Sequence, residues 1–510
     1  MVFAKYTIKF IFGNHGSTLD KAEEEKTMEE KERKIQVPMF DSVVLMLVII
    51  AEIVTCVRGG LNLAVPLFLT WVIMYAYSLI KKYDWGEIEG YALQSVRDGF
   101  QSVVIVGAVG CLIGAWILCG TVPTLIYFGL QVIQPSIFLP ATLVLCTILS
   151  LATGTSYGSA ASAGLACMGI GLSMGFPAGV IAGAVICGAL FGDKMSPFSD
   201  TTNLAPAMAK GTLYGHIRSM CYNTIPAWII TLVIFAIMGS RYSVGTYDPT
   251  TINEYMAGLA SHFHIGLLPL IPMFLVIAML VLKTPALPTI LLGAVFGGAV
   301  AMIGEGATFI TVVKVMHKGF SIKSGIFLVD KLLNRGGITS MYDIMMIMIF
   351  AMGLGGMLER MGVLQNFINL FIKKIHSLGS LVFATMATSY LSGAIGCTMS
   401  MAHVITGKLF APIYREEGVS PDVLSRTMED CGTLGGTLMP WHTNAVFFTG
   451  TLGVTYAEYI PYVYLCYLAP IISLIFAFLG VAVWYVDPKT GKPIRADQAP
   501  INQKKQIERK

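Results

Sequence analysis

The chain has 510 residues, of which 55% are hydrophobic and only 13% charged, and its mean hydropathy is +0.70. Soluble domains carry about 45–50% apolar and about 25% charged residues, so this composition excludes an ordinary soluble enzyme and indicates a polytopic membrane protein. The formal net charge of +4 comes from loops and chain ends and does not argue for a nucleic-acid partner.

The chain opens with a polar segment, residues 1–36, in which we expect no signal peptide, because its apolar patch is short and no small-residue cleavage site follows. Helical spans need about 20 mostly apolar residues each. Candidate stretches lie near residues 40–57, 61–80, 99–119, 121–135, 137–153, 159–191 (two pieces), 213–239, 263–282, 285–303, 341–358, 379–411 (two pieces) and 458–486. Counting half-spans, the sequence predicts roughly eleven to fourteen crossings.

Lys and Arg concentrate in residues 314–335 and after residue 486, whereas Arg241 is the only one in residues 240–262. Because cytoplasmic loops carry more Lys and Arg, both termini are expected in the cytoplasm. The predicted division is a cytoplasmic segment 1–36, a first transmembrane repeat half 37–240, an external loop 241–262, transmembrane helices 263–303, a cytoplasmic linker 304–340, a second repeat half 341–486, and a basic cytoplasmic tail 487–510.

The ten cysteines lie in or beside apolar segments without a Cys-x-x-Cys pair, so neither a disulfide framework nor a zinc site is expected. The sequence contains neither a His-Glu-x-x-His motif nor a Gly-x-x-x-x-Gly-Lys-Ser/Thr loop, and therefore supports neither zinc proteolysis nor ATP-driven pumping. We expect a protein that is not an enzyme and has no cofactor.

Two clusters place charged and hydroxyl-bearing residues between long apolar segments. The first is residues 192–203 (GDKMSPFSDTTN), and the second runs from Glu429 to Asn444 (EDCGTLGGTLMPWHTN). A carboxylate at membrane depth costs several kcal/mol unless it is compensated, so such residues usually mark an ion or substrate path. One cluster in each half of the chain predicts a secondary transporter.

The two halves also share an order of features. Residues 154–158 interrupt an apolar run ahead of Asp193, and residues 393–400 interrupt another ahead of Asp430. Matching interruptions are typical of inverted-repeat transporters, although small residues are also ordinary in contacts between membrane helices. The predicted fold is an all-α polytopic membrane protein with inverted structural repeats, discontinuous helices and re-entrant hairpins.

Helix breaks at Pro197 and Pro440 would free backbone carbonyls that protein groups, water or a cation must satisfy. Sodium, a hard ion, prefers oxygen ligands. The cation- or proton-binding candidates are Asp193, Ser196, Ser199, Asp200, Thr201, Thr202, Asn203, Asp430 and Thr433, with Asp200 and Thr201 as sodium ligands. The substrate-binding candidates are Thr155, Ser156, Thr437, Trp441, His442, Thr443 and Asn444.

Several nearby residues have competing interpretations. Glu429 is a further candidate carboxylate, and Glu359 beside Arg360 is a weaker one. Lys194 is expected to pair with Asp193, in which case the pair could be purely structural. His442 lies inside the second cluster and is interpreted as functional, whereas His403 is interpreted as a packing histidine.

The strings Gly154–Gly158 (GTSYG), 192–205 (GDKMSPFSDTTNLA), 429–433 (EDCGT) and Pro440-Trp441 resemble the NhaC-type sodium/proton antiporter family, with similarity from about residue 40 to 486. The resemblance implies broken helices in inverted repeats, often in homodimers, and a bacterial cytoplasmic membrane location. It also implies transport of sodium and protons, of small organic acids such as malate and lactate, or of amino acids.

The second signature departs from the family pattern, because Gly436 and Thr437 replace a Ser-Pro pair and His442 replaces an amide side chain. The family's pattern therefore applies more directly to the first cluster, with its cation site, than to the second. Sodium/proton antiport with alternating access is the predicted function, with sodium- or proton-coupled carriage of a small carboxylate or amino acid as the alternative. The expected partners are sodium, protons, such a solute, the lipid bilayer and a second copy of the chain.

Overall fold

The computed structural model describes residues 35–132, 134–242, 249–282, 284–325, 329–330, 333–372, 375–486 and 493–495. Nearly all of the predicted segment 1–36 and of the tail 487–510 lies outside the described residues. The described chain is helical except for one antiparallel hairpin, β1 (Trp484–Val486) with β2 (Pro493–Arg495), which the all-α prediction missed.

Nine helices in the described part are long and apolar enough to cross a membrane, or ten when one bent pair is counted as a span. The protein is therefore a multi-pass membrane protein. The nine are α3 (Met39–Arg58), α4 (Ala64–Lys81), α5 (Trp85–Leu118), α7 (Pro135–Thr153), α10 (Ala178–Met195), α12 (Leu213–Tyr242), α15 (Ala286–Gly304), α18 (Tyr342–Arg360, with the preceding 3₁₀ turn) and α20 (Leu378–Gly396). The bent pair joins α24 (Tyr456–Tyr459) and its 3₁₀ turn to α25 (Tyr464–Leu479) at 47°.

The remaining helices are shorter or more polar, and the predicted eleven to fourteen crossings had counted half-spans as well as full ones. They are α6 (Thr121–Val132), α8 (Ser156–Ser159), α9 (Leu165–Ser173), α11 (Asp200–Ala209), α13 (Pro249–His262), α14 (Ile271–Val281), α16 (Phe309–Lys318), α19 (Val363–Ile372), α21 (Met399–Glu416), α22 (Pro421–Met428) and α23 (Thr443–Leu452). Two π-helices, η2 (Ala160–Gly164) and η5 (Glu429–Thr433), and the 3₁₀ turn η6 (Gly435–Leu438) continue some of them.

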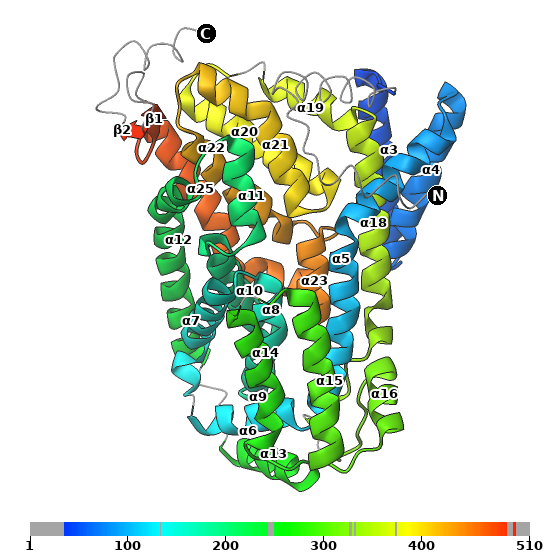
Figure 1. Cartoon of the computed structure of the whole chain (residues 1–510), viewed down its shortest axis with the longest axis vertical. Helices are drawn as coiled ribbons and strands as arrows, with labels where there is room; N and C mark the ends of the chain where they lie inside the picture. Colours follow the sequence, from blue (N-terminus) through cyan, green and yellow to red (C-terminus); the bar gives the residue numbers. More distant parts are fainter. Residues whose placement is uncertain are drawn as a thin grey trace, which may run out of the picture.

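The hairpin α14–α15 returns the chain to the side on which it started. His264 Nδ1, before the hairpin, lies 2.8 Å from Glu305 Oε2, after it. Figure 1 accordingly places α13 and α16 at the same end of the molecule. The external loop at 241–262 and the cytoplasmic linker at 304–340 remain predictions from the charge pattern.

Helix boundaries recur at a constant spacing of 243 residues. Helices α7 and α20 differ by 243 at both ends (378 − 135 and 396 − 153), and so do α11 and α23 (443 − 200 and 452 − 209). The same spacing relates residues 156–173 to 399–416 and residues 178–195 to 421–438. Figure 1 places α6 and α9 toward one end of the long axis and α19 to α22 toward the other.

The two matching parts of the chain, from α7 to α11 and from α20 to α23, are called the first and second segments. The same local geometry produces the first interruption in each of them. Gly154 and Cys397 end α7 and α20 in the left-handed region, with φ of 70° and 58°. The next residues, Thr155 and Thr398, are extended, and their side chains cap the following helix by accepting a backbone N–H. A left-handed residue followed by a hydroxyl N-cap stops one helix and starts another.

A proline lies in the second interruption of each segment. Pro197 precedes the extended Ser199, after which α11 begins, and Pro440 precedes the extended His442, after which α23 begins. The acidic residues do not follow this correspondence. At a spacing of 243, Asp193 matches Gly436 rather than Asp430, so the predicted matching order applies to the breaks and not to the carboxylates.

Helix α10 lies at the centre and is almost wholly buried, because glycines let neighbouring backbones approach it. A Cβ at Gly188 would meet the carbonyl oxygen of Leu143 in α7, and one at Gly192 would meet that of Thr147. On another face, a Cβ at Gly183 would lie 2.7 Å from the carbonyl oxygen of Tyr462. Close backbone packing thus fixes the helix that carries the first polar cluster.

We predict that Gly188→Ala lowers the stability of the purified protein by about 1–3 kcal/mol, because the added methyl group overpacks a backbone contact. Gly90→Ala is the matched control, since Gly90 in α5 has no neighbour near its Cβ position and alanine favours the helix. Thermal melting in detergent measures both, and an equal melting temperature for the two variants would contradict the packing role.

Candidate functional site

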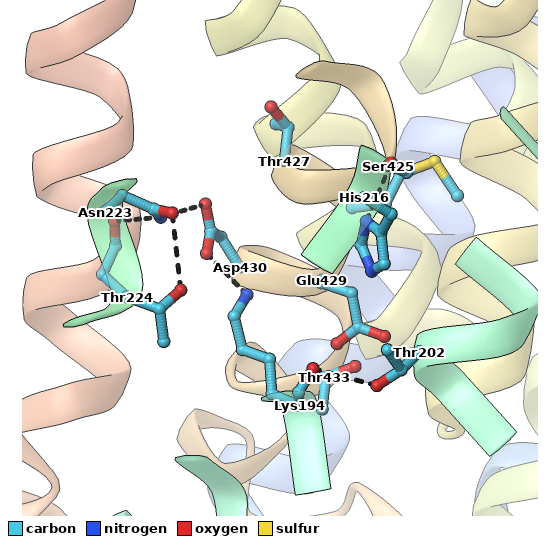
Figure 2. A network of polar contacts seen from close by, with 12 residues as sticks. Lys194, Thr202, His216, Asn223, Thr224, Ser425, Thr427, Glu429, Asp430 and Thr433 are labelled. Carbon is cyan, nitrogen blue, oxygen red and sulfur yellow. Dashed lines mark hydrogen bonds and ion pairs between the residues drawn. The ribbon is translucent and has the colours of Figure 1, made fainter. Parts of the chain in front are cut away.

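An ion pair joins the two polar clusters. Lys194, in the last turn of α10, places Nζ 2.7 Å from Oδ1 of Asp430 in η5, and neither side chain is exposed. Asn223 in α12 donates from Nδ2 to the other carboxylate oxygen of Asp430 at 2.8 Å. Figure 2 shows Asp430 between these two partners. Lys194 therefore pairs with Asp430 and not with the expected Asp193, and both oxygens of Asp430 are occupied by protein donors.

Asp193 accepts a hydrogen bond from Ser156 Oγ at 2.7 Å on Oδ2, and it is 5% exposed. In the described part of the chain it has no ion pair with Lys, Arg or His. Thr202 donates from Oγ1 toward the carbonyl oxygens of Lys194, at 2.9 Å, and Asp193, at 3.2 Å. The first turn of α11 thus satisfies carbonyls that the end of α10 leaves free.

The remaining residues of the first cluster separate into buried and exposed groups. Ser199 and Thr201 are buried, with their hydroxyl oxygens 3.1 Å apart, and Ser196 donates to the carbonyl oxygen of Leu151 at 2.8 Å. Asp200 and Asn203 are exposed. The expected sodium ligands Asp200 and Thr201 therefore lie in different environments.

Glu429, the first residue of the π-helix η5, is fully buried, and neither of its carboxylate oxygens has a hydrogen-bond partner. His403 Nε2 lies 3.7 Å from Glu429 Oε1 and forms its hydrogen bond with Thr433 Oγ1 at 3.0 Å. His216 Nδ1 pairs with Ser425 Oγ at 2.8 Å. Figure 2 shows Glu429 between His216 and Thr202.

Sequence reasoning missed His216 and Asn223 and assigned His403 to packing. All three are completely buried beside the ion pair or Glu429. The available signal was that His216 and Asn223 interrupt the apolar run that forms α12, but one polar residue in a long helix is usually explained by local hydrogen bonding. The weaker candidate Glu359 lies in the last turn of α18.

Five of the predicted substrate residues lie at the break between η6 and α23, whereas Thr155 and Ser156 lie at the start of α8. Asn444 donates to the carbonyl oxygen of Thr433 at 3.1 Å and accepts from Tyr157 of the first segment at 2.9 Å. The next residue back along the chain, Thr443, donates its N–H to the carbonyl oxygen of Cys397 at 3.0 Å. These bonds tie the start of α23 to both segments.

Two polar atoms in the same region have no partner. His442 uses Nδ1 to cap the backbone of Asn444 at 3.1 Å, which leaves its buried Nε2 without a hydrogen bond, and the buried hydroxyl of Thr437 also lacks one. Trp441 donates from Nε1 to the carbonyl oxygen of Ala394 at 2.7 Å, which holds its ring against α20.

The charges of this buried region do not balance. The carboxylates are Asp193, Glu429 and Asp430, and the cations are Lys194 and Arg426, which lies within electrostatic range of Asp430. Three acids against two bases leave one negative charge when all five are ionised. Because an uncompensated buried charge is costly, one monovalent cation or one proton would stabilise the region.

A family model described as the Na+/H+ antiporter family matches residues 188–481, a range that includes the ion pair and the second break of each segment. The chain belongs to this family. It is 33% identical over 420 residues to the Na(+)/H(+) antiporter NhaC of Alkalihalophilus pseudofirmus, a match that covers 82% of this chain and 90% of that protein. The protein is thus a secondary antiporter of the NhaC family and not an enzyme.

Other relatives of this chain carry different names. The chain is 36% identical over 462 residues to the malate-2H(+)/Na(+)-lactate antiporter of Bacillus subtilis, covering 90% of this chain and 99% of that protein. It is 31% identical over 450 residues to the arginine/ornithine antiporter ArcD of Halobacterium salinarum, covering 86% and 91%. A solved structure of Neisseria gonorrhoeae MtrF aligns over 77% of this chain and 84% of that one at 11% identity, with a TM-score of 0.30.

We predict that Lys194→Met destabilises the protein by about 3–5 kcal/mol, because it leaves the carboxylate of Asp430 buried without a cation. The double variant Lys194→Met/Asp430→Leu should regain most of this stability. The partly exposed pair Lys81–Asp41, at 2.6 Å, is the control, and Lys81→Met should leave the melting temperature close to that of the wild type, because solvent screens this pair. Thermal melting in detergent compares the variants, and a double variant no more stable than Lys194→Met would contradict the pairing.

Proposed function

We propose that this NhaC-family protein is a sodium/proton antiporter, with the cation bound among the buried residues at the breaks of α10–α11 and η5–α23. The observation that carries the proposal is the excess negative charge left by Asp193, Glu429 and Asp430 against Lys194 and Arg426. One sodium ion or one proton neutralises it, and because the two compete for the same negative region, binding of one releases the other.

Alternating access follows from the paired segments in this proposal. The constant spacing of 243 residues, and the placement of α6 and α9 opposite α19 to α22 in Figure 1, support two inverted repeats whose breaks face a common site. Movement of one part against the other would expose that site to each side of the bilayer in turn. The cytoplasmic position of both termini and the homodimer remain predictions from charge pattern and resemblance.

We predict that Asp193→Asn abolishes sodium-driven proton exchange, because it removes the excess charge that attracts the cation. Asp200→Asn should retain exchange with a weaker apparent sodium affinity, since Asp200 is exposed and acts on Asp193 only at a distance. Solid-supported membrane electrophysiology on proteoliposomes measures both variants. Full exchange by the Asp193 variant would show that cation binding does not need the negative charge of Asp193.

An experiment on the wild-type protein tests the proposed function directly. Sodium jumps under a pH gradient, with no organic solute present, should evoke transient currents or internal pH changes. If neither appears until a carboxylate or amino acid is added, sodium/proton antiport is the wrong assignment and a solute carrier is the right one.

Exchange of a small organic acid is the second candidate. The unpartnered Nε2 of His442 and hydroxyl of Thr437 would suit a substrate carboxylate, and one relative, at 36% identity, is a malate/lactate antiporter. For this function, we predict that His442→Asn changes which acids drive transport while leaving the melting temperature close to that of the wild type. Counterflow with malate, lactate and arginine tests this, and an unchanged substrate profile would return His442 to a capping role.

A further inference from the structure

Three carboxylates lie in the buried site, and they differ in what already occupies their oxygens. We infer that Glu429 is the carboxylate that receives the transported cation, an assignment that rests on the proposed antiport function. The sequence left Asp193, Asp200, Asp430 and Glu429 as candidates for this role, and the geometry favours Glu429 among them.

Asp430 is already satisfied by the protein. Lys194 Nζ lies 2.7 Å from one of its oxygens and Asn223 Nδ2 lies 2.8 Å from the other. A sodium ion that entered here would have to displace the lysine ammonium group and would add a second cation beside it. Asp430 therefore acts as the fixed counter-ion of Lys194 in this structure.

Asp193 is partly satisfied, because Ser156 donates a hydrogen bond to its Oδ2 at 2.7 Å. Glu429 differs from both aspartates, since it is 0% exposed and neither of its oxygens accepts a hydrogen bond. A fully buried carboxylate without a donor is strongly unfavourable, so it requires a bound cation or a proton.

The cations nearby compensate Glu429 only in part, and none of them forms a hydrogen bond to it. Lys194 faces it from α10 but is committed to Asp430, and Arg426 from α22 donates to the carbonyl oxygen of Ala482 at 2.8 Å. His403 from α21 is 3.7 Å away, beyond hydrogen-bond distance. The nearby groups therefore leave its charge to a mobile ion.

Oxygen ligands for such an ion surround Glu429. The hydroxyls of Thr433, on the same π-helix, and of Thr201, from the first turn of α11, lie beside its carboxylate. Hard cations prefer carboxylate and hydroxyl oxygens. Thr201 belongs to the first segment and Thr433 to the second, so a cation at Glu429 would contact both segments.

The local backbone is consistent with this role. Residues 429–433 form a π-helix between α22 and η6, and single π-turns within α-helices are frequent at functional sites. Gly432 in this turn leaves no room for a side chain, since a Cβ there would lie 2.9 Å from the His403 ring. The imidazole can therefore pack against the turn and hold the hydroxyl of Thr433 beside the carboxylate.

The test measures sodium binding to the purified full-length protein by the rise in melting temperature in sodium chloride over choline chloride. The wild type should show this rise, and Glu429→Gln should lose it. Asp422→Asn is the matched control, because Asp422 is also buried and lies seven residues earlier, on α22, the helix that leads into η5. It should keep the wild-type rise.

Glu429→Asp covers the case in which the glutamine variant does not fold. The shorter carboxylate should bind sodium at least tenfold more weakly, measured as the concentration that gives half of the rise. Wild-type sodium dependence in either Glu429 variant overturns the assignment, while wild-type sodium/proton currents would still support antiport. Absence of those currents in the wild type would instead refute the proposed function.

Discussion

The buried contact between Lys194 and Asp430 fixes the relation between the two interrupted segments. It joins residues 236 positions apart at a distance of 2.7 Å, where neither side chain reaches solvent. A pair of this kind is costly to bury and more costly to break, because the partner left behind keeps its charge. Electrostatics as well as packing therefore fixes the position of the end of α10 relative to the end of α22. The starts of α11 and α23, which follow in the chain, are positioned with them.

That pairing also determines which charges are left over. Because Lys194 is paired with Asp430, the buried carboxylates of Asp193 and Glu429 repel each other. Hydroxyl groups surround them, and little nearby positive charge is left to compensate them. A site that binds one monovalent cation, and gives it up when a proton arrives, needs this kind of incomplete compensation. A fully paired cluster would be a stable core without a transport role.

Glycine packing and the helix breaks serve the same site. Helix α10 is buried because Gly188 and Gly192 leave room for the backbone of α7. The helix ends at Met195, and Pro197 follows. Polar groups that the breaks expose are satisfied across the segments, as when Asn444 links Thr433 to Tyr157. The helix breaks therefore cost little free energy here, because polar groups at one break form hydrogen bonds with groups at the other. A break that faced lipid would leave its backbone groups without hydrogen-bond partners.

The sequence by itself determined the membrane class, the family and the places where helices stop, since apolar length, left-handed glycine, proline and the two polar strings are local properties. Only the tertiary structure decided which side chains interact. Lys194 pairs with Asp430 and not with its neighbour Asp193, and Asp200 is exposed. His216 and Asn223 reach the buried site from α12, a helix whose sequence is otherwise mostly apolar. Such choices depend on which helix faces lie together after folding. The compensation of each buried charge is a property of that arrangement, and no stretch of sequence contains it.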